Sequence, residues 1–160
     1  MKKNYYPFNS ELLVIASGNI AVIKSTLGHY CGYAAIKNTM IPKSWQGNYD
    51  ADALQYLNIH GGITFCEKEG EWTVFGFDCA HAGDENNHKL YDSDYIIRLS
   101  RSMRNQILSY ARIIKKWRLA DRNTKMTMVQ RVIDKSEFKN ELGFGALIGM
   151  LSGASEFGEE

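Results

Sequence analysis

The chain has 160 residues, which is enough for a single domain with a sizeable core. Its hydrophobic share of 44% and formal net charge of +1 argue against an intrinsically disordered chain and against a protein that coats nucleic acid in bulk. No apolar run reaches the length of a membrane span, and three cysteines without framework spacing fit reduced thiols, so we expect a cytoplasmic protein.

The first third of the chain has the pattern of short antiparallel strands. Apolar runs alternate with turn-forming residues, among them Gly18, and this pattern is typical of strands joined by tight turns. The expected elements, in chain order, are strands at residues 12–15, 20–23 and 30–36, a loop at 39–48 and a short helix at 50–57. Asp50 is expected to cap that helix.

A hairpin is predicted at the centre of the chain. Residues 63–66 and 72–78 flank the charged segment 67–71, which we interpret as a five-residue turn. The register that follows pairs His60 with Asp78, Gly62 with Gly76, Thr64 with Val74 and Cys66 with Trp72 on one face. The side chains expected on the opposite, core-facing side are Ile63, Phe65, Phe75 and Phe77.

From Asp92 onward the apolar period changes from two to about 3.6. The apolar stripe consists of Ile96, Leu99, Met103, Ile107, Tyr110, Ile114 and Trp117. It predicts a long helix capped by Asp92 or Ser93, and acids at its start suit the helix dipole. The expected fold class is therefore α+β, an antiparallel sheet with a long amphipathic helix packed on one face, in one domain spanning residues 1–160.

The last part of the chain is less clear from its pattern. Residues 125–133 fit either a strand or a second helix, and another helix is expected from Ser136 to Leu142. The segment 141–153 is apolar and rich in glycine but too short to span a membrane. We expect it to pack against the core or against a second copy of the chain, which would make a homo-oligomer, with peripheral membrane contact as the alternative.

The near-neutral total charge conceals two charged regions. Acidic residues dominate between residues 50 and 94, whereas basic residues dominate between 98 and 125. Two interpretations stay open: complementary solvated surfaces, or a basic groove that binds phosphates.

Two histidines and a carboxylate close together predict acid–base chemistry. The catalytic set is His60, Asp78 and His81, in which Asp78 orients His60 as the base and His81 acts as the acid. The paired strand glycines leave a bare floor where a ligand can approach the backbone. The residues expected to bind the ligand are Thr64, Gly61, Gly62, Tyr33, Asp84 and His29, without a metal or a cofactor. The alternative is a satisfied structural His60–Asp78 pair beside a glycine bulge.

Two other chemistries use the same region. His29 with Cys31, and Cys79 with His81, could each place two ligands on one strand face and together form a Cys₂His₂ zinc site. Cys79 could also be a nucleophile with His60 or His81 as its base, although strand alternation turns Cys79 away from His60.

Three motifs also carry a resemblance to a protein family. They are Gly28-His29-Tyr30-Cys31-Gly32-Tyr33, His60-Gly61-Gly62-Ile63-Thr64-Phe65 and Gly76-Phe77-Asp78-Cys79-Ala80-His81-Ala82-Gly83-Asp84. They resemble the GHxCGYV-like, HGGxT[YF] and GFDCxHxGD motifs of small proteins from bacteriophages and prophages. Those proteins continue into a charged helix, here residues 92–108, and the resemblance covers roughly residues 27–115.

The resemblance implies a phage-encoded accessory protein in the host cytoplasm and, by analogy, an anti-defence role against a nucleotide immune signal. The leading hypothesis is a metal-independent phosphodiesterase that binds and cleaves a cyclic nucleotide. The second is a sponge that sequesters the ligand, with Tyr33, Trp45 or Trp72 stacking on a base. The third is an inhibitor that acts through protein contacts. A membrane and polymeric nucleic acid are not expected as partners.

Overall fold

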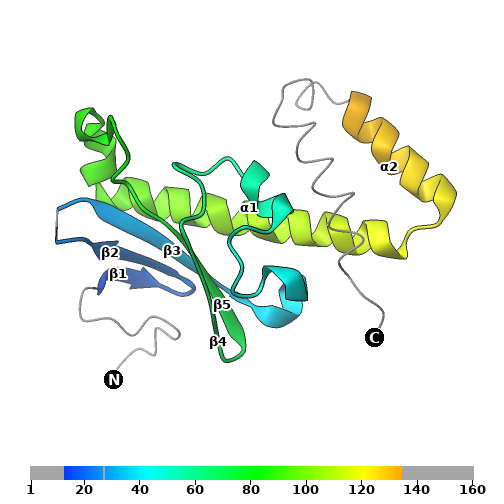
Figure 1. Cartoon of the computed structure of the whole chain (residues 1–160), viewed down its shortest axis with the longest axis horizontal. Coiled ribbons are helices and arrows are strands. Elements are labelled where there is room, and N and C mark those ends of the chain that lie inside the picture. Colours follow the sequence, from blue (N-terminus) through cyan, green and yellow to red (C-terminus); the bar gives the residue numbers. More distant parts are fainter. Residues whose placement is uncertain (1–12, 27, 135–160) are drawn as a thin grey trace.

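The computed structural model describes residues 13–26 and 28–134, and its strands form one antiparallel sheet. The strands are β1 (Leu13–Ser17), β2 (Ile20–Lys24), β3 (Tyr30–Lys37), β4 (Phe65–Glu69) and β5 (Trp72–Phe77). Their order is β1-β2-β3-β5-β4, which makes β1 and β4 the edge strands (Figure 1). The strands expected near residues 12–15, 20–23 and 30–36 are confirmed, except that Leu12 lies outside the described residues.

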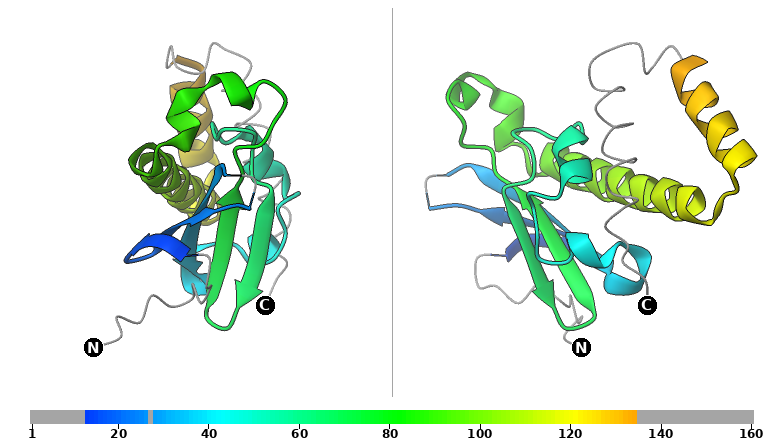
Figure 2. Two further views of the ribbon diagram at one scale, coloured as in Figure 1. Left: turned by 90° about the vertical axis from the view of Figure 1, so that its left-hand side faces the viewer. Right: turned by 45° about the vertical axis from the view of Figure 1, so that its right-hand side comes forward.

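A long helix, α1 (Ser93–Leu119), lies across one face of the sheet (Figures 1 and 2). Asp92 caps this helix as expected, because its carboxylate accepts a hydrogen bond of 2.9 Å from the backbone N–H of Asp94. The fully buried members of the apolar stripe are Ile96, Met103, Ile107 and Ile114. The expected α+β class, with an amphipathic helix on one face of an antiparallel sheet, is confirmed.

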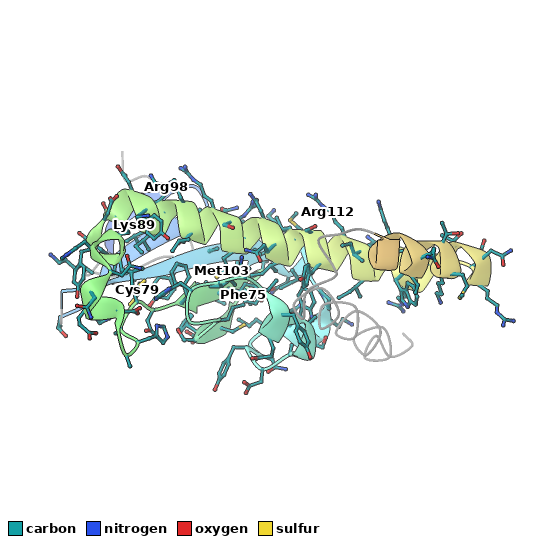
Figure 3. All side chains as sticks on the ribbon, turned by 90° about the horizontal axis from the view of Figure 1, so that it is seen from above. Phe75, Cys79, Lys89, Arg98, Met103 and Arg112 are labelled. Carbon is teal, nitrogen blue, oxygen red and sulfur yellow. The ribbon has the colours of Figure 1, made fainter. Side chains whose placement is uncertain are left out.

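The main core lies between α1 and the sheet. Val22, Ile36 and Phe75 are fully buried on the covered face of the sheet, in one cluster with Met103 of the helix. Figure 3 shows Phe75 and Met103 between the helix and the strands, whereas Arg98 and Arg112 project from the outer side of α1. Burial of each large apolar side chain contributes about 1.5–3 kcal/mol, so this layer fixes the helix on the sheet.

Gly32 of β3 allows the close packing of this layer. A Cβ atom at position 32 would lie 2.6 Å from the ring of Phe77 and would also overlap the hydroxyl group of Ser100 in α1. Ser100 is fully buried, and its hydroxyl donates to the carbonyl of Ile96 at 2.9 Å. The glycine thus lets the helix and the Phe77 ring approach the same point of the sheet.

The register of the β4–β5 hairpin differs from the prediction by three residues. Observed partners are Phe65 with Gly76, Cys66 with Phe75 and Glu69 with Trp72. The turn therefore has two residues rather than five, and Gly70 opens it with φ +56°. The charged residues 67–69, which we had placed in the turn, extend the edge strand β4 instead.

This register removes two expected features. Residues 60–62 precede β4, so Gly62 does not pair with Gly76. Phe65 is 37% exposed and packs edge-to-face on Tyr33, with ring centroids 5.6 Å apart, on the side of the sheet away from α1. Because a Cβ at Gly76 would meet the Tyr33 ring at 2.6 Å, Gly76 is covered and is not a bare floor. The core positions predicted for Phe75 and Phe77 are correct.

The remaining segments are short helices and loops. The helix expected at 50–57 is a 3₁₀ helix, Asp52–Tyr56, whose cap position is Ala51 rather than Asp50. The segment 125–133 belongs to a second helix, α2 (Arg122–Asp134). The helix expected from Ser136 and the segment 141–153 lie outside the described residues. Within the described part of the chain, no helix is both long and apolar enough to cross a membrane.

Candidate functional site: a histidine–aspartate cluster beside the β4–β5 hairpin

The site is built from two loops that leave the sheet at the same end. Since β4 and β5 are antiparallel, the loop that enters β4 lies beside the loop that follows β5. The backbone N–H of Thr64 donates to the carbonyl of Gly76 at 2.9 Å and extends this pairing by one step. His60 lies in the first loop, and His81 and Asp84 lie in the second.

A tight turn presents His60. The N–H of Gly62 donates to the carbonyl of Ile59 at 3.0 Å, which closes a four-residue turn with His60 and Gly61 at its centre. Gly61 has φ +64° and Gly62 has φ +80°, a backbone conformation that residues with a side chain rarely adopt. The two glycines of the His60-Gly61-Gly62 motif therefore shape the loop.

Asp84 is the centre of the cluster. One carboxylate oxygen, Oδ2, lies 2.9 Å from Nε2 of His60 and 3.1 Å from Nδ1 of His81. The same oxygen accepts the backbone N–H of His81 at 2.8 Å, which holds the second loop in a closed turn. The two imidazole rings meet edge-to-face with centroids 5.3 Å apart. We define His60, His81 and Asp84 as the histidine–aspartate cluster.

The electrostatics of the cluster favour an ionised carboxylate. Only 13% of the Asp84 side chain is exposed, compared with 26% for His60 and 36% for His81. Burial raises the pKa of Asp84, but the hydrogen bonds from His60 and from the backbone and side chain of His81 outweigh it and lower the pKa below 3.8. At neutral pH this carboxylate therefore offers negative charge to both histidines.

The predicted pairing of His60 with Asp78 is wrong. His60 lies in a loop and contacts Asp84, whereas Asp78 Oδ1 lies 3.7 Å from Nε2 of His81 and accepts the N–H of Ala80 at 3.1 Å. The predicted catalytic residues thus lie near one another, but Asp78 lies beside His81 and not beside His60. Asp84, expected only to bind ligand, takes the place that we had assigned to Asp78.

Gly61 also fixes the position of His81. A Cβ atom at position 61 would overlap the imidazole of His81, so only glycine lets that ring lie against the first loop. By contrast, a Cβ at Gly62 or at Gly83 would meet no atom within 4 Å. The cluster is therefore packed at Gly61 and open at Gly62 and Gly83.

The other residues predicted to bind the ligand are not members of the cluster. Thr64 is exposed just before β4, four residues beyond His60 in the chain. Tyr33 packs on Gly76, and burial, followed by the charges of Cys31 and Asp78, raises its pKa to about 12. His29 lies in the β2–β3 turn, where its Nδ1 is 3.0 Å from Oγ of Ser25, and not in the cluster.

The two cysteine-based alternatives do not fit this geometry. Cys79 is only 3% exposed and belongs to the core, and burial, with smaller contributions from Cys31, Asp84 and Asp78, raises its pKa to about 12. A thiol in this state is a poor nucleophile at neutral pH. Within residues 13–26 and 28–134, the cluster is the group of three or more His, Cys, Asp or Glu side chains that could hold a metal, so the Cys₂His₂ set is not assembled.

Of the aromatic residues considered for base stacking, Trp45 is excluded by its position. It is 1% exposed and part of the core, and its carbonyl accepts the thiol of Cys66 at 3.4 Å. The Trp72 ring is covered on one side by the ammonium group of Lys37, which lies 5.6 Å from the ring centroid. Trp72 also lies at the turn end of β5, opposite the end that leads into the cluster loop.

Basic residues of α1 line surface hollows that include no residue of the histidine–aspartate cluster. One hollow of about 400 Å³ lies between α1 and the β1–β2 turn and is lined by Asn19, Ile20, Arg101, Arg104 and Asn105. Ile20 pairs with Ala34, which pairs in turn with Phe75 of β5, so this hollow lies beside the sheet and not beside the loop that follows β5. The hydrogen bonds and ion pairs of the cluster involve no arginine within the described part of the chain, so the basic region considered as a phosphate groove is separate from the cluster.

Comparison with known proteins adds no relative: no protein-family model, no curated protein and no solved structure matches the chain.

Proposed function

We propose that this chain is a phage-encoded accessory protein that binds a small nucleotide-type signalling molecule at the histidine–aspartate cluster and cleaves its phosphodiester bond. The observation that carries the proposal is the convergence of two histidines on one carboxylate oxygen, at 2.9 and 3.1 Å. The resemblance of the three motifs to phage proteins supports the phage setting. The nucleotide-type ligand is inferred by analogy and from the acid–base chemistry that the residues permit.

The hydrogen bonds give the two histidines different free nitrogens. When His60 donates Nε2–H to Asp84, its Nδ1 is left as an unprotonated base. When His81 is protonated, Nδ1–H is directed to Asp84 and Nε2–H lies on the side of Asp78. One histidine can therefore accept a proton while the other donates one, which is the requirement for general acid–base catalysis.

These roles balance for hydrolysis of a phosphodiester. His60 Nδ1 takes a proton from water as the water oxygen bonds to phosphorus. The bond from phosphorus to the leaving ester oxygen breaks, and His81 Nε2–H supplies the proton that this oxygen gains. Asp84 keeps both rings in place and stabilises their protonated forms without itself being consumed.

Two glycines that neighbour the cluster residues in the chain leave room for a ligand. Gly62 and Gly83 have positive φ angles and no atom within 4 Å of where a Cβ would stand, so a ligand can approach the backbone beside the histidines. Exposed Thr64 lies two residues beyond Gly62 and offers a hydroxyl to a phosphate oxygen.

A panel of cyclic dinucleotides and oligonucleotides tests the proposal, with products separated by chromatography. We expect turnover of at least one compound by the wild type and a loss of about 10²–10⁴-fold in His60→Ala, the size of a general-base contribution. His88→Ala is the matched control, because His88 is exposed in the 3₁₀ helix His88–Tyr91 and lies outside the cluster. Ligands that bind but return intact would reject cleavage and leave sequestration, and a panel without binding would reject both.

A further inference from the structure

We infer that His60, His81 and Asp84 form a binding site for one divalent transition-metal ion, of which Zn²⁺ is the best match. The inference rests on the same cluster as the proposed function and gives His60 and His81 the role of metal ligands in place of base and acid. It also replaces the expectation of a site without a metal.

The first argument is the spacing of the candidate ligand atoms. Ligands that surround one Zn²⁺ at about 2.0–2.2 Å are roughly 3.0–3.6 Å from one another in octahedral or tetrahedral arrangements. Here the carboxylate oxygen lies 2.9 Å from Nε2 of His60 and 3.1 Å from Nδ1 of His81, and ligand atoms of all three residues lie within 4.8 Å of one another. The two oxygen–nitrogen separations thus lie close to the spacing of ligands around one ion.

The second argument is the carboxylate behind His81. A histidine that binds a metal through one ring nitrogen usually donates the N–H of the other nitrogen to a carboxylate or a carbonyl, which fixes the tautomer and orients the ring. With Nδ1 of His81 as the ligand, Nε2–H is directed to the side of Asp78, whose Oδ1 lies 3.7 Å away. Asp78 is in turn held by the N–H of Ala80 at 3.1 Å.

The third argument is that the ligand set is open. Three protein ligands leave at least one coordination position for water, the pattern of catalytic rather than structural zinc sites. A Cβ at Gly62 or at Gly83 would meet no atom within 4 Å, and all three ligand side chains are partly exposed. An ion that is reached from solvent in this way can exchange and can hold a ligand oxygen.

The donor types select the metal. Two imidazoles and one carboxylate suit Zn²⁺ and other divalent transition metals, whereas Mg²⁺ and Ca²⁺ prefer oxygen donors alone. A metal at this site would lower the pKa of its bound water and supply hydroxide at neutral pH, a task that His60 carries in the metal-free scheme. The ion would also neutralise charge on a phosphate oxygen.

Direct metal binding to the full chain tests the inference. The protein is stripped with a chelator and titrated with Zn²⁺ by calorimetry, and the bound metal is counted by elemental analysis. We expect one Zn²⁺ per chain, at least a 100-fold weaker affinity in His60→Ala and in His81→Ala, and a loss of about 10–100-fold in Asp78→Asn, the size of an outer-shell effect. Circular dichroism verifies that each variant is folded, and His88→Ala is the control that should bind like the wild type.

Co²⁺ provides a second readout that does not depend on activity. Substitution should give visible absorption bands of a low-symmetry nitrogen–oxygen site in the wild type, and these bands should be absent in His81→Ala. Equal Zn²⁺ affinity in wild type and His81→Ala, or no binding by the wild type, would overturn the inference. Nucleotide cleavage that persists in chelator-treated protein would overturn a catalytic role for the metal and leave the proposed function intact. Specific Zn²⁺ binding without cleavage of any nucleotide would support the metal site and reject the proposed cleavage.

Discussion

Individual glycines of this chain serve two opposite purposes. In the segment 28–33, Gly32 lies inside β3, where the Phe77 ring and the Ser100 hydroxyl fill the space that a side chain would need. In the loops at 60–62 and 83–84, Gly62 and Gly83 have positive φ, and a Cβ at either position would meet no atom within 4 Å. Gly32 thus holds the helix on the sheet, whereas Gly62 and Gly83 leave room next to ionisable residues.

This contrast separates stability from chemistry along the sequence. All three motifs contain glycine and histidine, yet Gly32 of the first contributes packing, whereas the second and third motifs supply the residues of the histidine–aspartate cluster. Gly61 combines both properties, because it has φ +64° and also supports the His81 ring. Substitutions at these glycines should therefore have effects that differ in kind.

The largest loss of stability is expected for Gly32→Ala. The added methyl group would overlap the Phe77 ring and Ser100 in a fully packed layer, so we expect the free energy of unfolding to fall by about 1–3 kcal/mol. Urea denaturation measures this loss. Zn²⁺ affinity of the folded fraction should stay within twofold of the wild type, and a large drop in affinity would break the separation between the two regions.

Gly61→Ala and Gly62→Ala form a matched pair in the cluster loop. Both should lose about 1–2 kcal/mol of stability, since each forces a residue with a Cβ into a left-handed conformation. Only Gly61→Ala also displaces the His81 ring, so only this variant should lose most of its Zn²⁺ affinity and turnover. Equal effects of the two substitutions on affinity would show that His81 does not depend on Gly61.

Asp84→Asn should change the pH dependence of stability. The pKa of Asp84 lies below its ordinary value of 3.8 in the folded chain, so its ionised form stabilises the fold above that pH, and this contribution is lost as the pH falls through the folded pKa. The difference in unfolding free energy between wild type and Asp84→Asn should thus be full near pH 6 and shrink below pH 3.8. A difference independent of pH would contradict the ionic role of Asp84.

Thr64→Ala is expected to have the smallest effect on stability. Its side chain is exposed in the loop that enters β4, and surface substitutions of this kind usually change stability by less than about 0.5 kcal/mol. Affinity for a nucleotide ligand should fall several-fold if the hydroxyl contacts a phosphate oxygen. Unchanged affinity in a binding assay would remove Thr64 from the ligand site.

The sequence predicted the sheet and the long helix because their apolar periods are regular. It failed at the hairpin register, because the charged edge strand at 67–69 looks like a turn, and the real turn begins at Gly70. That error moved Asp78 next to His60. The contact of His60 with Asp84 joins two loops 24 residues apart, and no periodic pattern specifies a contact between loops. The contact of Asp84 with His81 is local, because both residues belong to the motif His81-Ala82-Gly83-Asp84 and the carboxylate of Asp84 accepts the N–H of His81.

A double-mutant cycle between His60 and Asp84 tests most directly whether the two loops form one cluster. The free energies of unfolding are measured by urea denaturation for His60→Ala, Asp84→Ala and the double variant, with a second cycle that pairs His88→Ala with Asp84→Ala as the control. The contact at 2.9 Å predicts a coupling of about 0.5–3 kcal/mol in the first cycle and additivity within about 0.5 kcal/mol in the second. Additive effects of His60 and Asp84 would contradict the cluster on which both proposals rest.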